Sequence, residues 1–421
     1  MNQKMSELHI GLDDTDSQKG MCSTYVVSQI LQKLDLRKNL ISPPELVRLN
    51  PTIPWKTRGN GALSIRLKLG QKNIENLKKE IIELVEEYRE ESSNSGVVFF
   101  DNDPRNIEEL RDFSKKAVKE IVKIQNAREL AKEYGEAYEF GNGQGVVGAV
   151  CAVGYVFSDY TFELIGYRKK ERWGTERDLE KNSVKKISKK YSPTIWDNFD
   201  WRNSEMVLSP NSPCPVLFGI RGDSKERIIE ASKELRGEEV VLKQLFKTNQ
   251  GTDEHLQHKK NIDKIKPYTS VIIKGEVVRE PETIEGGHVI LGICGEAGNV
   301  IDCAAYEPTK DFRNTIRKLI KGDTIKVFGG VRKKPLTINL EKIKIIDLAI
   351  NSEEKNPVCP DCGNRMESAG KEQGYRCRKC STFANKKVKI FRERELEEKV
   401  YEVPPTARRH LSKPLIREEQ D

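Results

Sequence analysis

The stretch Leu8-His-Ile-Gly-Leu-Asp-Asp-Thr-Asp-Ser17 joins a short apolar run to three closely spaced acids. Such a run predicts a buried β-strand that ends where the carboxylates begin. At the carboxyl edge of a strand in an α/β sheet, side chains project into the crevice where ligands usually bind. The stretch therefore predicts an α/β domain and places a candidate site within it.

The residues that follow extend this domain with alternating helix and strand patterns. Apolar side chains recur three and four apart over 26–34 and 74–88, which predicts two amphipathic helices. Strict alternation over 62–69 and an apolar run over 96–100 predict strands, while 48–61 reads as a loop because it holds two prolines and two glycines. We expect one long helix from Ile107 to Tyr134, and an α/β domain over residues 1–138.

The next two segments predict a smaller unit and a barrel. Residues 139–255 fit a second α/β or α+β unit, whose Gly/Ala/Val-rich stretch after Gly145 suits either a tightly packed helix or a buried strand. Residues 268–350 show three strands, a helix over 309–320 and two more strands, the order of an OB-fold barrel. An OB-fold binds oligonucleotides on one sheet face, although an unrelated small barrel or a barrel used only for packing has the same pattern.

Four of the nine cysteines cluster near the end of the chain. Cys359, Cys362, Cys377 and Cys380 form two Cys-x-x-Cys pairs. Two such turns can close a tetrahedron around Zn²⁺, so residues 357–384 predict a structural zinc ribbon whose folding depends on the metal. A redox dithiol pair or chance spacing is the weaker reading. Residues 385–421 form a charged, basic tail.

The composition and the missing motifs disfavour several classes of protein. The 421 residues are 36% hydrophobic and 33% charged, with a net charge of +8, which permits a nucleic-acid partner without requiring one. The longest weakly polar run, 145–157, is too short for a membrane span of about 20 residues, and no secretory signal opens the chain, so we expect a cytoplasmic protein without a membrane partner. Walker A and H-E-x-x-H motifs are missing, which disfavours P-loop ATPases and zincins. The five histidines show no hydrolase triad.

Three adjoining motifs are candidates for phosphate chemistry. Clustered carboxylates repel one another, so Asp13, Asp14 and Asp16 suit Mg²⁺ bridging to nucleotide phosphates, or else a surface turn. Ser23 or Thr24 stands where a helix should begin and could be an N-cap, a phosphate ligand or a phosphoryl acceptor. The basic, glycine-rich turn could approach phosphates closely or could be a mobile loop; its candidate residues are Lys56, Arg58, Gly59, Asn60 and Gly61.

Other residues are candidates for contacts with RNA. Trp173, beside Arg172, could stack on a base, although a rim or core tryptophan is the commoner case. The run Arg332-Lys333-Lys334 lies at the end of a predicted barrel strand. Arg408, Arg409 and Lys413 could grip phosphates, or could belong to a solvated tail.

Taken together, these motifs resemble one family. The chain resembles the archaeal 2-agmatinylcytidine synthetases that act on the AUA-reading isoleucine tRNA, and the matching pieces run in order along nearly the whole chain. They are Gly11-Leu-Asp-Asp-Thr-Asp-Ser17, Gly20-Met-Cys22, Leu49-Asn-Pro-Thr-Ile-Pro-Trp-Lys-Thr-Arg-Gly-Asn-Gly61, Trp173-Gly-Thr175, Pro213-Cys-Pro-Val-Leu-Phe-Gly-Ile-Arg-Gly222, Thr248-Asn-Gln-Gly-Thr-Asp253, the four cysteines and Glu402-Val-Pro-Pro-Thr-Ala-Arg-Arg-His-Leu-Ser-Lys-Pro414.

The resemblance implies an architecture and a reaction. The implied domains are kinase-like (1–138), ferredoxin-like (139–255), OB-fold (268–350) and zinc ribbon (357–384), with a tRNA-binding tail (385–421). The implied enzyme is a ligase that joins agmatine to C2 of the wobble cytidine, position 34, of the CAU-anticodon isoleucine tRNA through a phosphorylated cytidine, with ATP converted to AMP and diphosphate.

The resemblance also assigns roles to residues. Asp13, Asp14 and Asp16 would handle ATP and Mg²⁺. The family's phosphoryl-accepting threonine is replaced here by Ser23, with Thr24 next, so either hydroxyl could serve. Two alternatives stay open. A non-catalytic RNA-binding protein would use only the barrel and ribbon, and a ligase that uses lysine in place of agmatine lacks support because the bacterial S-G-G-x-D-S type loop is missing.

Overall fold

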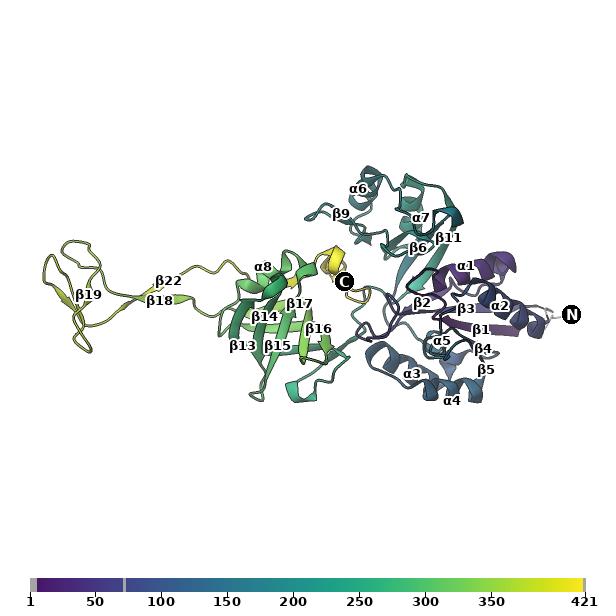
Figure 1. The fold of residues 1–421 in the computed structure, drawn as a ribbon, viewed down its shortest axis with the longest axis horizontal. Coiled ribbons are helices and arrows are strands. Elements are labelled where there is room, and N and C mark those ends of the chain that lie inside the picture. The colour runs from purple at the N-terminus through teal and green to yellow at the C-terminus, as the bar shows by residue number, and fades with distance from the viewer. Residues whose placement is uncertain (1–5, 71–72, 419–421) are drawn as a thin grey trace.

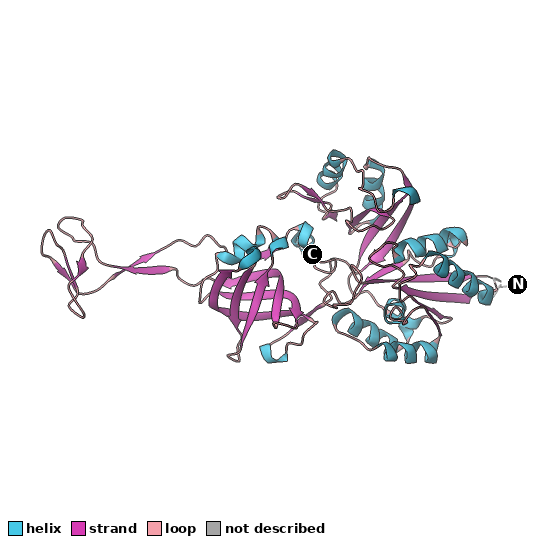
Figure 2. Ribbon diagram, in the orientation of Figure 1, coloured by secondary structure: helices cyan, strands magenta, loops and turns pink. Residues whose placement is uncertain are grey.

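A computed structural model describes residues 6–70 and 73–418. Figure 1 shows an elongated molecule with the N-terminal modules at one end, a barrel in the middle and a small cysteine-bearing unit at the far end. Helices flank the sheet of the N-terminal half, whereas the barrel is built almost entirely of strands (Figure 2). Among the described residues, no helix combines the length and apolar character needed to cross a lipid bilayer.

One mixed sheet runs through the first two predicted domains. Within the described chain its nine strands lie in the order β5-β4-β1-β3-β2-β11-β6-β10-β7. The two halves meet where β2 pairs in parallel with β11, Glu45 opposite Lys247 and Leu46 opposite Thr248. The strands are β1 (Ser6–Asp13), β2 (Glu45–Arg48), β3 (Gly61–Leu69), β4 (Gly96–Phe100), β5 (Glu136–Glu139), β6 (Thr161–Arg168), β7 (Ile195–Trp196), β10 (Val216–Gly222) and β11 (Val240–Thr248).

Helices cover both faces of this sheet. On one face α1 (Ser23–Lys33) packs with α2 (Ile74–Tyr88) and reaches across the junction to β6, whose Ile165 and Tyr167 join the same core. On the other face α5 (Val146–Gly154) lies under α3 (Glu108–Lys119) and α4 (Ile124–Tyr134), and the second half carries α6 (Lys181–Lys190) and α7 (Lys225–Glu234). The predicted strands at 62–69 and 96–100 and the two amphipathic helices are confirmed.

The Gly/Ala/Val-rich stretch is a helix, α5, and every residue in it is buried. It lies so close to the sheet that a Cβ on Gly11 would be 2.2 Å from the Ala149 carbonyl oxygen, and one on Gly96 would be 2.2 Å from the Val146 nitrogen. Side chains at those two strand positions are therefore impossible without moving the helix. This contact brings the start of α5 against the end of β1.

The single helix expected from Ile107 to Tyr134 is wrong, because α3 ends at Lys119 and α4 begins at Ile124. Carbonyls of the last turn of α3 are used elsewhere: Ala117 accepts from the backbone of Asn50 at 3.1 Å and Lys119 from the Gln257 side chain at 3.1 Å. No glycine or proline marks the break. The helix expected over 309–320 is also shorter, since α8 spans only Phe312–Arg317.

The third module is a closed five-stranded barrel. Its strands are β13 (Ser270–Thr283), β14 (Val289–Cys294), β15 (Val300–Ala305), β16 (Thr324–Arg332) and β17 (Thr337–Asp347). They pair in the order β13-β14-β15-β17-β16, and β16 pairs back with β13 to close the ring. The predicted order of three strands, a helix and two strands is therefore confirmed.

The end of the chain doubles back on itself. A two-stranded arm of β18 (Ser352–Lys355) and β22 (Val388–Phe391) carries the cysteine unit away from the barrel (Figure 1). The chain returns as β23 (Val400–Glu402) on the barrel strand β17 and then crosses to the N-terminal modules, ending in α9 (Leu415–Glu418). We call residues 403–418 the strap. Backbone bonds from Gly251 and Thr252 to His410 and Leu411 fix it in place.

Candidate active site

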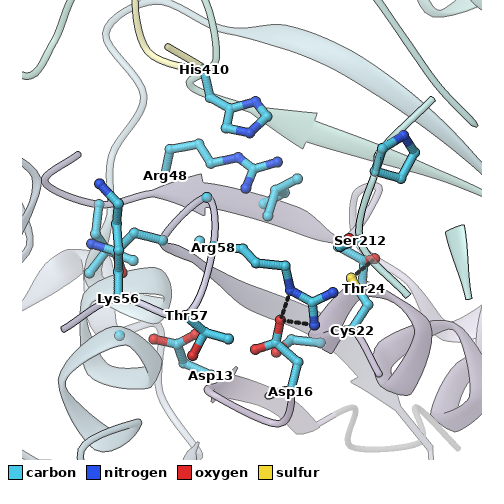
Figure 3. A pocket seen from close by; sticks show the side chains of 18 of the residues that line it. Asp13, Asp16, Cys22, Thr24, Arg48, Lys56, Thr57, Arg58, Ser212 and His410 are labelled. Carbon is cyan, nitrogen blue, oxygen red and sulfur yellow. Dashed lines mark hydrogen bonds and ion pairs between the residues drawn. The ribbon is translucent and has the colours of Figure 1, made fainter. Parts of the chain in front are cut away.

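A cavity of about 400 Å³ opens where the two halves of the nine-stranded sheet meet the strap. Figure 3 shows Asp13 and Asp16 at one end, Arg48 and His410 at the other, and Arg58 between them. The acidic loop, the first turn of α1, the 53–61 loop, strands β6 and β10, and the strap all contribute lining residues. Every residue predicted to handle ATP, Mg²⁺ or the transferred phosphoryl group is in this lining: Asp13, Asp14, Asp16, Ser23, Thr24, Lys56, Arg58, Gly59, Asn60 and Gly61.

Asp13 occupies a tight slot at the end of β1. A Cβ on Gly148, in α5, would lie 1.9 Å from its Oδ2, so only glycine leaves room for this carboxylate. Its Oδ1 accepts a hydrogen bond from the Asp14 backbone at 2.7 Å. Burial and the neighbouring Asp14 raise the pKa of Asp13 well above its ordinary value. The carboxylate is thus held in a place where a cation would relieve a large electrostatic cost.

Asp14 and Asp16 complete the acidic loop in different ways. Asp14 has a left-handed backbone, with φ +56°, which turns the chain sharply after the strand. Burial and the charge of Asp16 raise the pKa of Asp14 to about 6, even though it accepts hydrogen bonds from Asn94 and Thr57. Asp16 is paired with Arg58, whose Nε lies 2.8 Å from its Oδ2.

Arg58 is mainly a structural ligand of the acidic loop. Besides Asp16, its Nη2 donates to the carbonyls of Ser17, Gly20 and Met21 at 3.1, 2.9 and 2.7 Å. These bonds close the loop between β1 and α1. Among the described residues, only Nη1 of this side chain lacks a protein acceptor and remains available to a phosphate.

The helix α1 begins at the cavity with an unusual cap. The cap position is Cys22, and its side chain makes no capping hydrogen bond, so the prediction of Ser23 or Thr24 as an ordinary N-cap is wrong. Ser23 Oγ instead accepts hydrogen bonds from the Thr15 backbone and hydroxyl at 3.3 and 3.0 Å, and Thr24 Oγ1 lies 3.0 Å from Cys22 Sγ. Within the described part of the chain the backbone N–H groups of Ser23 and Thr24 have no acceptor, because those of Tyr25 and Val26 bond to the Cys22 carbonyl, so the first two are left for an anion in the cavity.

The 53–61 loop supplies a cation and two close approaches. Lys56 donates to the Pro51 carbonyl, and burial together with Arg409 lowers its pKa to about 8. A Cβ on Gly59 would lie 2.7 Å from Arg48 Nη1 and 2.9 Å from His410 Nε2, so glycine is needed for these groups to converge. The loop is tied to its neighbours: Asn60 Nδ2 donates to the Asn50 carbonyl at 2.8 Å.

Four lining residues with acidic or basic side chains were not predicted: Arg48, Glu163, Arg221 and His410. Glu163 accepts from Gln250 at 2.6 Å and Arg221 at 3.1 Å and lies 3.7 Å from Arg48. Burial opposes its charge, but the two arginines and Gln250 hold the pKa of Glu163 below its ordinary value. Arg48 Nε and His410 Nδ1 are buried and find no hydrogen-bond partner among the described residues. Burial beside Arg48 and Arg221 lowers the pKa of His410 well below normal.

A signal for some of these residues was present in the sequence. Arg221 and His410 lie inside motifs that resemble the family, whereas Glu163 lies in an ordinary strand and carries no local mark. The cavity therefore has an acidic end and a cationic end, and its lining includes buried polar atoms, Arg48 Nε and His410 Nδ1, that have no hydrogen-bond partner among the described residues.

The four cysteines come together as predicted. Their sulfur atoms all lie within 4.8 Å of one another, and this is the only such group of three or more potential ligands among the described residues. Cys362 and Cys377 Sγ are 3.5 Å apart, which suits neighbouring corners of a zinc tetrahedron. The three carboxylates of the acidic loop do not converge in this way, so they fit a metal held by one or two side chains plus phosphates.

The predicted RNA-binding residues fall into two groups. Arg332, Lys333 and Lys334 are exposed at the end of β16, and Arg172 is exposed beside Trp173. The indole of Trp173 is half-buried, packs edge-on to Tyr25 at 5.3 Å and donates to the Arg168 carbonyl at 3.2 Å.

The last described part of the predicted basic tail, residues 403–418, is packed on the protein, whereas residues 385–395 are mostly exposed. Arg408 is buried and lies 2.7 Å from Asp197, with Glu402 as a second partner. Arg409 Nη1 lies 3.3 Å from Glu341, and the Lys413 backbone donates to Asp253 at 2.7 Å. Most of these charges hold the strap on the protein.

Comparisons with known proteins match both the modules and their order. Three family models match: the TiaS TCKD domain over residues 9–142, the TiaS FLD domain over 143–255 and the TiaS C-terminal zinc ribbon domain over 356–396. The isoleucine-tRNA 2-agmatinylcytidine synthetase TiaS of Archaeoglobus fulgidus is 45% identical over 413 residues, which cover 97% of each chain. The chain belongs to the TiaS family. The TiaS of Methanocaldococcus jannaschii is 44% identical and covers 98% of this chain and 99% of its own.

Solved TiaS structures agree along nearly the whole chain. A crystal structure of TiaS in complex with its isoleucine tRNA and ATP matches with a TM-score of 0.91 at 43% identity, covering 98% of this chain and 97% of that one. A complex of TiaS with the same tRNA, AMPCPP and agmatine matches with a TM-score of 0.87 at 41% identity and the same coverage. The family expected from the motifs is thus confirmed.

Proposed function

We propose that this protein is an ATP-dependent ligase that joins agmatine to C2 of the wobble cytidine of the CAU-anticodon isoleucine tRNA, forming 2-agmatinylcytidine. The observation that carries the proposal is the cavity, which gathers every predicted ATP- and metal-handling residue in a chain 45% identical to a TiaS over 97% of its length. A binding-only protein has no use for three clustered carboxylates whose pKa values are raised, chiefly by burial.

The chemistry explains the need for ATP. The C2 carbonyl of cytosine is a poor electrophile and its oxygen is a poor leaving group. Phosphorylation of that oxygen makes it expendable, and the primary amine of agmatine can then attack C2 after losing a proton. The cytidine must leave the anticodon stack to reach such a cavity.

The acidic end of the cavity suits the nucleotide. We assign Asp13 and Asp14 to Mg²⁺, which would offset charge on the transferred phosphoryl group when bound. Asp16 is already neutralised by Arg58, so its role is to shape the loop. Three sets of donors belong to residues that line the same cavity and would hold phosphate oxygens. They are the free N–H groups at the start of α1, the ammonium group of Lys56, and Nη1 of Arg58. Either Ser23 or Thr24 could accept a phosphoryl group there.

The remaining modules suit the tRNA. On this proposal the first unit is kinase-like, the second ferredoxin-like and the barrel an OB-fold, and Zn²⁺ held by the four cysteines stabilises the ribbon. The exposed Arg332, Lys333 and Lys334, together with Arg172, would contact the RNA backbone. The strap closes the cavity and links the barrel to the catalytic modules.

The decisive test is mass analysis of the nucleosides from a transcript of the CAU-anticodon isoleucine tRNA incubated with ATP, Mg²⁺ and agmatine. We expect 2-agmatinylcytidine with the parent and none with Asp13→Asn, while lysine in place of agmatine gives no adduct. Labelled ATP followed in the same reaction should give AMP, which requires that a second phosphoryl group leaves the nucleotide besides the one transferred to the cytidine oxygen and released from C2 as phosphate. Unmodified cytidine with a folded, tRNA-binding parent would overturn the proposal and leave the binding-only reading.

A further inference from the structure

The helix α6 carries two rows of lysines with different surroundings. Lys186 and Lys190, four residues apart, both pair with Glu234 at the end of α7. Lys181, Lys185 and Lys189 also recur every four residues, which places them along one side of the helix at a spacing of about 6 Å. Among the described residues, no carboxylate lies within ion-pair distance of these three side chains. We call Lys181, Lys185 and Lys189 the free lysine row.

An aromatic hairpin lies beside the free lysine row. It consists of β8 (Phe199–Asp200) and β9 (Glu205–Met206), and Figure 1 shows β9 next to α6 at the outer end of the second module. The ammonium groups of Lys181 and Lys185 lie 5.7 and 5.3 Å from the centre of the Phe199 ring. Trp201 packs edge-on to Phe199 at 4.9 Å yet is 56% exposed.

The tip of this hairpin is rigid before any partner arrives. Asp200 is buried and its Oδ1 accepts from the backbones of Arg202 and Asn203 at 3.1 and 3.0 Å. Its Oδ2 accepts from Thr406 of the strap at 3.0 Å. Glu205, the other acid of the hairpin, is paired with Lys310 of the barrel. The exposed indole is therefore presented on a fixed turn.

We propose that the free lysine row and Trp201 form an RNA-binding surface on the second module, separate from the barrel and the ribbon. A row of uncompensated ammonium groups fits the phosphates of one strand, and a rigid, exposed indole beside it fits a base stacked outside a helix. The surface is distinct from the catalytic cavity, because none of its residues lines that cavity. The inference rests on the proposed function in taking tRNA as the RNA.

The test measures binding of a transcript of the same isoleucine tRNA to full-length protein between about 50 and 300 mM salt, without ATP or agmatine. Replacing Lys181, Lys185 and Lys189 together by Ala should weaken binding at least about ten-fold and reduce the slope of log affinity against log salt by about two to three. The matched control, Lys186→Ala with Lys190→Ala, removes two lysines that are both paired with Glu234 and should change affinity less than about two-fold. Trp201→Ala should weaken binding about five- to hundred-fold, and Trp201→Phe should restore most of it.

Equal affinity of the free-row variant, the control variant and the parent overturns the surface, provided that the melting temperatures agree. A loss in the free-row variant with an unchanged salt slope also overturns it, because a lost phosphate contact must change the slope. Failure of the proposed function has a different signature: the parent would then form no 2-agmatinylcytidine, whatever the lysine rows do to tRNA binding.

Discussion

The guanidinium of Arg58 grips one carboxylate oxygen of Asp16, with Nε at 2.8 Å and Nη2 at 2.6 Å. The same side chain binds three carbonyls of the loop that leads to α1. Arg58 thereby sets where the acidic loop and the start of the helix lie relative to each other.

Replacing Arg58 by Lys should lower the rate of agmatine conjugation about 100-fold, because an ammonium group cannot replace the planar donor and a small misplacement of catalytic groups has effects of that order. Single-turnover kinetics at saturating ATP measure the effect. Lys19→Ala, an exposed change in the same loop, is the control. A rate for Arg58→Lys within about two-fold of the parent contradicts the positioning role.

Asp14→Asn should stabilise the ligand-free protein while removing activity. The pKa of about 6 means that the folded state holds this proton more tightly than the unfolded chain, so stability falls as pH rises from about 4 to about 6 and stays lower above that range. Asn carries no ionisable group, so it avoids the loss of stability that ionisation of Asp14 causes, and it tolerates the left-handed backbone. We therefore expect the free energy of unfolding to rise by on the order of 1–2 kcal/mol at pH 7.5.

Denaturant unfolding of Asp14→Asn at pH 7.5 and near pH 3.5 measures this gain, which should vanish at the lower pH. At subsaturating Mg²⁺, the activity of the parent should fall as pH drops through about 6, because Asp14 of the metal-free protein then takes up a proton. A variant that is less stable than the parent at pH 7.5 would contradict this account.

Gly148→Ala should abolish conjugation without unfolding the chain. The new Cβ would lie 1.9 Å from Asp13 Oδ2, so the carboxylate must leave its slot. Binding of a fluorescent ATP analogue, compared between Gly148→Ala and Gly70→Ala, checks the prediction, since a Cβ on Gly70 meets nothing within 4 Å. Parent-like nucleotide affinity and rate in Gly148→Ala would show that Asp13 need not stay where it is.

Arg408→Ala should lower the stability of the protein and leave RNA binding unchanged, although the sequence around Arg408 suggests a contact with RNA. The guanidinium is buried against Asp197 and Glu402, and removing one partner of a buried pair costs about 3–5 kcal/mol. Thermal unfolding should show a lower melting temperature. In variants measured well below that temperature, the salt slope of tRNA binding should stay unchanged, and a reduced slope would restore the RNA-binding reading.

Removal of zinc should unfold only the ribbon. Its buried core consists of Cys359, Met366 and Cys377, and the two-stranded arm is its connection to the barrel. We expect one zinc per chain by elemental analysis, and proteolysis confined to 356–396 in Cys377→Ser. General unfolding of the barrel in that variant would contradict an independent ribbon.

Local patterns predicted much of this molecule because their causes are local. Leu63, Ile65, Leu67 and Leu69 alternate because β3 presents one face to α1, and the paired cysteines form their cluster within a single short unit. The acidic motif was placed at the end of a strand for the same reason.

Features that depend on distant partners were missed. From the sequence, Arg408 is a candidate for a phosphate contact. In the structure it is paired with Asp197, which is far upstream in the chain. The junction of β2 with β11 has four residues on one side and no sequence mark. At the break after Lys119, the carbonyls of α3 bond to Asn50 and Gln257, which are distant in sequence. His410 enters the cavity because the strap crosses the molecule.

The shared ladder between β2 and β11 restricts how the enzyme can move. A hinge between the two N-terminal modules would have to break backbone hydrogen bonds in the middle of a continuous sheet. The distance between the cavity walls that the two halves of this sheet provide therefore stays constant. Only the two other lining segments, the 53–61 loop and the strap, can then move to fit a substrate. Selection among small amines would then depend on a preset gap and not on domain closure.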